Sequence, residues 1–163
     1  MRRGIFTAVL MATLVLAGGA LADVPPGATP LDVTPVVASG GYAVLDGGGV
    51  TGGCWTVTSR VGQDTSTGTY LLYFKPVWCG NGISITGYDL SRAWPYVSGW
   101  YSFDGFDGAW LVGGGWGDSH IMPRAQGRFS WHPPIIGYTS YNTAWITLWL
   151  TAGGSAFLYG YQE

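Results

Sequence analysis

The sequence predicts an all-β fold, an antiparallel β-sandwich of about eight strands, with a small β-barrel as the alternative. Three observations support this prediction. Short runs of β-branched and aromatic residues recur at intervals of about eight to twelve residues. Glycine clusters at 47–49, 113–115 and 153–154 mark turns or bulges between these runs. In the region after the first 41 residues, no window of about a dozen residues is apolar at helical spacing and free of Gly and Pro.

The N-terminal residues predict export. Residues 1–22 have the pattern of a signal peptide: a basic start, an apolar run over Gly4–Ala17, and a small-residue tail that ends at Ala22. We therefore expect cleavage after Ala22 and a secreted, extracellular protein. Residues 23–41 are rich in Pro and Thr and predict a leader or linker, because proline fixes an extended backbone. A single β domain is expected over 42–163.

The domain is expected to consist of strands separated by turns. The predicted strands are Tyr42–Leu45, Cys54–Ser59, Thr69–Cys79, Ile83–Leu90, Tyr96–Phe103, Ala109–Val112, Gly127–Trp131, Ala144–Thr151 and Ala156–Tyr161. The strand at Ala144–Thr151 has the clearest alternation, with its aliphatic residues on one side and its Trp and Thr residues on the other. We expect the aliphatic side to face the core. The Trp and Thr side then lies under a loop or forms an exposed aromatic strip.

The sequence contains two cysteines, Cys54 and Cys79. If the strands that carry them form a hairpin around the polar turn at Gly62–Gly68, the two side chains face each other near its open end. Export to an oxidising compartment favours a disulfide between them, because their spacing matches neither a zinc site nor a redox motif. Such a bond closes a loop of about 25 residues and adds roughly 3 kcal/mol to the stability.

Several short motifs resemble a group of small secreted β-sandwich proteins of actinomycete type. These motifs are Cys54-Trp55-Thr56-Val57, Trp78-Cys79-Gly80-Asn81-Gly82-Ile83, Gly127-Arg128-Phe129 and Trp145-Ile146-Thr147-Leu148. The resemblance covers residues 54 to about 160 and implies the fold. The resemblance implies no activity. Such proteins often have a second cysteine pair in the later half, which this chain lacks.

Charge and composition exclude several classes of partner. The formal net charge is −2, and the basic residues that remain after signal cleavage are spread from Arg60 to Arg128 without forming a patch. This pattern argues against nucleic acid and against an anionic membrane as partners. The hydrophobic fraction of 47% includes the signal, and the most apolar later stretch has the length of a strand. We therefore expect no membrane association after signal cleavage.

No set of residues makes a persuasive catalytic or metal site. The Asp-Gly steps at Asp104 and Asp107 predict a hairpin turn, with a Ca²⁺ site or a catalytic pair as alternatives. Asp118, Ser119 and His120 are adjacent and predict a polar turn, since a catalytic triad is assembled from separate segments. His120 and His132 could bind Zn²⁺ with Asp118, but isolated histidines are more often packing or surface residues. The sequence therefore predicts no catalytic residue, no metal and no cofactor, and it does not favour an enzyme.

The strongest functional signal is aromatic, because the chain has nine tryptophans. Large rings can fill the space that glycines leave in a sandwich, or an exposed row of them can stack on sugars or anchor a protein. We select Trp145 and Trp149 as ligand-binding candidates, followed by Trp94 and Trp100. The leading hypothesis is a non-enzymatic domain that binds a glycan or an extracellular protein at the cell envelope.

Two other functions remain open. The first is a structural or inhibitory module that a partner recognises through loops such as Gly113–Met122. The second is an exported hydrolase that uses Asp104, Asp107 or His120.

Overall fold

The structure is a computed structural model that describes residues 24–36, 52–135 and 137–162. The signal peptide predicted at 1–22, the strand predicted at Tyr42–Leu45 and the glycine cluster at 47–49 lie outside these residues. The described residues form twelve strands and no helix. In this part of the chain there is accordingly no helix of the length and apolarity that crossing a membrane requires.

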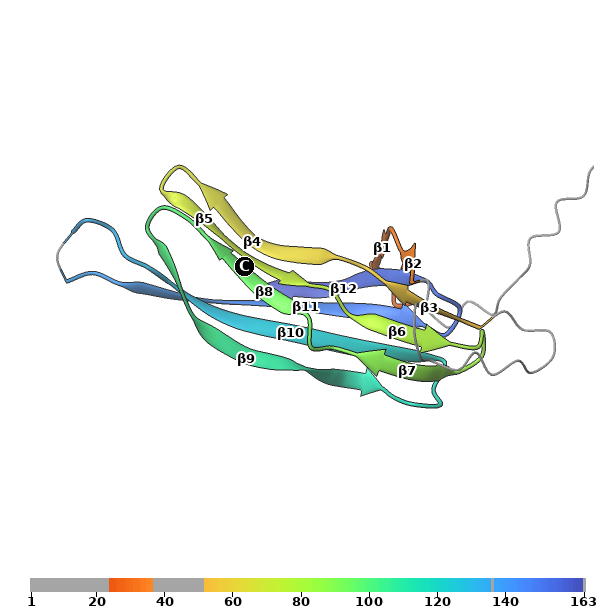
Figure 1. Ribbon diagram of the computed structural model, residues 1–163. Helices are drawn as coiled ribbons and strands as arrows, with labels where there is room; N and C mark the ends of the chain where they lie inside the picture. Colours follow the sequence, from red (N-terminus) through yellow and green to blue (C-terminus); the bar gives the residue numbers. More distant parts are fainter. Residues whose placement is uncertain (1–23, 37–51, 136, 163) are drawn as a thin grey trace, which may run out of the picture.

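The strands form two facing layers (Figure 1). One layer is a single antiparallel sheet, sheet A, in the order β1-β12-β11-β10-β9. Its strands are β1 (Thr29–Leu31), β9 (Tyr101–Gly114), β10 (His120–Trp131), β11 (Ser140–Thr151) and β12 (Ala156–Gln162).

The other layer consists of two shorter sheets placed end to end over sheet A (Figure 1). Sheet B has the order β2-β3-β6-β7, and sheet C has the order β4-β5-β8. Their strands are β2 (Thr34–Pro35), β3 (Gly53–Thr56), β4 (Ser59–Thr65), β5 (Gly68–Phe74), β6 (Val77–Gly80), β7 (Ile85–Asp89) and β8 (Ala93–Val97). The predicted sandwich is confirmed, and the layers do not close into a barrel.

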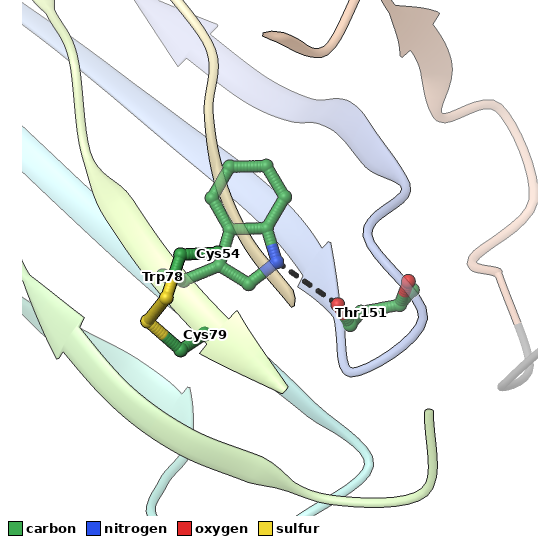
Figure 2. The surroundings of a disulfide bond; sticks show 4 residues. All are labelled: Cys54, Trp78, Cys79 and Thr151. Atoms are coloured by element: carbon green, nitrogen blue, oxygen red, sulfur yellow. Dashed lines mark hydrogen bonds between the residues drawn. A yellow bond between two sulfur atoms is a disulfide. The ribbon is translucent and has the colours of Figure 1, made fainter. Parts of the chain in front are cut away.

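The hairpin that carries the cysteines is formed as predicted, although its arms bend from sheet C into sheet B. Thr65 pairs with Gly68, so the turn between β4 and β5 is shorter than the predicted one. The bend lies between β5 and β6, where Pro76 has no N–H for the sheet. Beyond it, Cys54 lies opposite Cys79, and the two form the predicted disulfide (Figure 2).

The core lies between the layers and is apolar. In β11, Ala144, Ile146, Leu148 and Leu150 are fully buried, which confirms the predicted core side of this strand. The facing layer supplies the other large buried side chains, among them Tyr70, Leu72, Phe74, Trp78 and Ile85. Sheet A therefore buries one side and leaves the other side uncovered by either of the other sheets.

The predicted hairpin turn at Asp104 and Asp107 is wrong, because both residues lie inside the long strand β9. The glycines that follow them, Gly105 and Gly108, have φ angles of 145° and 128°. The pairing of β9 with β10 shifts register in this region, at Gln126/Gly127 and at Arg128/Phe129. The glycines therefore accommodate β-bulges rather than a chain reversal, since both structures need backbone angles that favour glycine.

The predicted leader contributes strands to both layers. Within 23–41, β1 pairs with β12 at an edge of sheet A, and β2 pairs with β3 at an edge of sheet B. The described part of this region therefore lies along the domain and covers one edge of each of these two sheets.

The layers approach each other closely where β6 ends. A Cβ added to Gly80 would meet the carbonyl oxygen of Ala152 and would lie 2.8 Å from the Ala152 Cα. We expect Gly80→Ala to lower the free energy of unfolding by about 1–3 kcal/mol, because backbone must move to admit the methyl group. Urea denaturation measures the change. Gly87→Ala is the matched control, since a Cβ there meets nothing within 4 Å; equal stability of the two variants would contradict this packing.

Candidate functional site

The candidate site is the outer side of sheet A, which we call the aromatic face. It includes an arginine, Arg124, and four aromatic side chains, Trp110, Trp145, Trp149 and Tyr159. The alternation of β11 places Trp145 and Trp149 on this side, as predicted, and both are half-buried. Trp110 and Tyr159 are more open, with exposed fractions of 38% and 47%. The predicted aromatic strip is therefore a partly exposed surface whose members lie on four neighbouring strands.

Contacts on three sides hold the Trp145 ring in place. The guanidinium carbon of Arg124 lies 4.3 Å from the ring centre. The indole Nε1 donates a hydrogen bond to Gln162 Oε1 at 2.6 Å. Gly160 lies close beneath, because a Cβ at that position would come within 3.3 Å of the ring. Contacts within sheet A therefore fix the orientation of the ring.

The second predicted tryptophan, Trp149, is stacked on a histidine. The rings of His120 and Trp149 are 3.8 Å apart and nearly parallel, at 10°. Tyr159 approaches from the next strand, with its ring centre 6.2 Å away. The Trp149 Nε1 is buried and has no hydrogen-bond partner among the described residues. His120 thus covers part of this ring, and it does not act as an isolated surface side chain.

Arg124 lies in the middle of the aromatic face, on the strand between β9 and β11. Its Nε donates to Thr147 Oγ1 at 2.8 Å, and Thr147 is fully buried although it lies on the outer side. In the sheet, Arg124 lies directly opposite Thr147 on one neighbouring strand and opposite Trp110 on the other. Sequence reasoning missed both Arg124 and Trp110. The signal that could have found Arg124 is the alternation of polar and apolar residues over 120–128.

The candidate carboxylates are engaged in bonds within the sheet. Asp107 Oδ1 lies 3.0 Å from Arg128 Nε, and its Oδ2 accepts a hydrogen bond from Gln126 Nε2 at 2.7 Å. Asp104 accepts from the hydroxyl of Ser130 at 2.8 Å. Each of these carboxylates is therefore held by neighbouring side chains of β10.

The residues considered for a metal site are kept apart. His120 begins β10, whereas His132 follows its other end, roughly 40 Å away at the rise of an extended strand. The polar turn predicted at Asp118 is present, since its N–H donates to Gly115 O. The described residues contain no group of three or more His, Cys, Asp or Glu side chains that could hold a metal ion.

The other two predicted tryptophans lie elsewhere. Trp94 is on the outer side of sheet C, 40% exposed and stacked on Tyr73 at 5.2 Å. Trp100 lies in the turn between β8 and β9, where its ring centre is 6.0 Å from that of Trp131. Of the four predicted tryptophans, only Trp145 and Trp149 share a surface.

A shallow recess adjoins the aromatic face at its β9 edge. Its volume is about 630 Å³, and it is lined by Tyr88, Asp89, Leu90, Ala109, Trp110 and Leu111. The Ser91 backbone N–H, 2.9 Å from the Asp89 carboxylate, lowers the pKa of that carboxyl. Asp89 is therefore ionised at neutral pH, and Arg92 is close enough to lower its pKa further.

Comparisons with known proteins give no family. No protein-family model, no curated protein and no solved structure matches this chain. The arguments for function therefore rest on the residues of the aromatic face.

Proposed function

We propose that this chain is a secreted, non-enzymatic binding domain that recognises a glycan through the aromatic face. The disulfide supports the extracellular location, because such bonds persist in oxidising compartments. The observation that carries the proposal is the fixed arrangement around Trp145, whose ring is packed against Arg124 and bonded to Gln162. A sugar ring has apolar faces and a rim of hydroxyl groups, so it is matched by aromatic rings next to planar polar side chains.

Preorganisation supports binding by this surface. Contacts within the sheet order Trp145, Trp149 and Arg124, so a ligand would not have to immobilise them. The Arg124 guanidinium covers one face of the Trp145 ring. The His120 ring covers part of the Trp149 ring. The more exposed Trp110 and Tyr159 provide the open rings, with Trp145 and Trp149 holding the centre of the face.

We expect a Trp145→Ala/Trp149→Ala double variant to lose glycan binding by about tenfold or more, because large aromatic residues dominate binding energy. The measurement is a pull-down on insoluble cell-wall and plant polysaccharides, with circular dichroism to confirm the fold. Trp116→Ala is the matched control, since Trp116 is 75% exposed in the turn between β9 and β10. Full binding by the folded double variant would place the site elsewhere.

The same control tests the second candidate function, recognition of the chain by a protein partner through Gly113–Met122. The exposure of Trp116 in this segment favours that function, because an exposed tryptophan is a common anchor of protein interfaces. In a pull-down against envelope proteins of the producing organism, capture that is lost on Trp116→Ala but kept in the double variant would favour this second function.

A further inference from the structure

The Arg124 guanidinium has hydrogen-bonding capacity that the fold does not use. Its Nε donates to Thr147, and its plane packs against the Trp145 ring. Five N–H groups belong to a guanidinium, so four remain on the two terminal nitrogens. Among the described residues, no acceptor contacts these nitrogens and no carboxylate pairs with Arg124. The side chain is therefore positioned by the sheet, with its terminal donors left for another molecule.

Two arginines and two aspartates carry the charges of β9 and β10. Arg124 and Arg128 are on β10, Asp107 and Asp104 are on β9, and Asp104 accepts a hydrogen bond from Ser130. Asp107 pairs with Arg128 and also accepts from Gln126. It therefore compensates Arg128 and leaves the charge of Arg124 unbalanced. The group that complements the centre of the aromatic face is an anion.

We propose that Arg124 binds the carboxylate of an acidic sugar, so that the ligand is a polysaccharide containing uronic acid. This inference rests on the proposed function and specifies its ligand class. The planar fork of a guanidinium matches the two oxygens of a carboxylate. In a uronic acid the carboxylate is attached directly to the sugar ring. Its binding at Arg124 therefore brings that ring beside Trp110, which lies directly opposite Arg124 in the sheet.

The number of available cations favours a carboxylate over more highly charged groups. Arg124 is the one arginine of the aromatic face without a carboxylate partner among the described residues. A polymer recognised only by its charge would need several cations along its length. A single fixed guanidinium flanked by rings is suited to one planar anion on an otherwise neutral ring.

The test compares Arg124→Gln with the unchanged protein by isothermal titration calorimetry, at about 0.15 M salt to screen long-range attraction. The probes are polygalacturonate, uncharged dextran and dextran sulfate. We expect the unchanged protein to bind polygalacturonate at least about tenfold more tightly than dextran, and Arg124→Gln to remove this preference. Arg124→Lys should also lose most of the preference, because it keeps the charge but not the fork.

The control is Arg60→Gln, which removes an exposed arginine from the opposite layer and should leave polygalacturonate binding unchanged. If Arg124→Gln does not fold, the loss of preference for polygalacturonate is tested with Arg124→Lys instead. Equal binding of dextran and polygalacturonate, lost in the Trp145→Ala/Trp149→Ala variant, would overturn the inference and leave the proposed function standing. Equal binding of dextran sulfate and polygalacturonate would overturn it as non-specific attraction. Absence of binding to all glycans would overturn both proposals.

Discussion

Replacing Trp78 with alanine is expected to lower the free energy of unfolding by about 3–5 kcal/mol. The side chain is fully buried in β6, and its removal would leave a large cavity between sheet B and sheet A. It also makes a bond between the layers: the indole Nε1 donates to Thr151 O at 2.9 Å (Figure 2). Urea denaturation of the purified protein measures the loss, with the slope m compared to confirm a two-state transition.

Trp78→Phe separates the two contributions. Phenylalanine restores most of the volume but removes the indole donor from the Thr151 carbonyl, which still accepts from the Gly154 N–H at 3.1 Å. We therefore expect a smaller loss of about 1–3 kcal/mol. Trp116→Ala is the matched control, because an exposed tryptophan should contribute within about 0.5 kcal/mol. A loss below about 1 kcal/mol for Trp78→Ala would contradict the burial of this side chain.

The parts of the fold that could be predicted depend on local patterns. Over Ala144–Thr151, aliphatic residues alternate with Trp and Thr, so the core side followed from the period of a strand. The cysteine pair followed from a polar turn that lies midway between the two cysteines. In both cases the residues that determine the structure are close together in the sequence.

The parts that could not be predicted depend on pairing between distant strands. Only the last five residues of β10 were predicted, and Pro123 lies in the part that was missed. The structure places Pro123 next to a register shift against β9, where the missing N–H is tolerated. The bulges at Gly105 and Gly108 were likewise indistinguishable from a turn until the pairing with β10 was known.

The same limit applied to the candidate site. Trp145 and Trp149 lie on one side of β11, as their spacing predicts. Arg124 was missed because its strand was not extended far enough. Its partners, Thr147 and Trp110, become neighbours only through pairing across three strands. The side of a strand on which a residue lies could therefore be predicted from the sequence of that strand. The position of Arg124 among its neighbours on the aromatic face could not.

Removing the Cys54–Cys79 disulfide is expected to lower the stability by about 3 kcal/mol, because the bond closes a loop with a sequence separation of 25. For a domain of this size the melting temperature should fall by roughly 10 °C. Calorimetric melting with and without a reductant measures the change, and a Cys54→Ala/Cys79→Ala variant should show the same loss. The protein, treated with a thiol reagent under non-reducing conditions, should show no reactive cysteine.

The origin of this loss can be separated from a loss of packing. The disulfide joins neighbouring strands on the side of sheet B opposite Trp78, so its removal leaves the core side chains in place. The main effect of removing the disulfide is to lift a constraint on the unfolded chain, which then expands and exposes more surface. The double alanine variant should therefore show a higher m value in urea together with its lower stability, whereas Trp78→Ala should lower stability at an unchanged m. An unchanged m in the double variant would contradict the entropic origin.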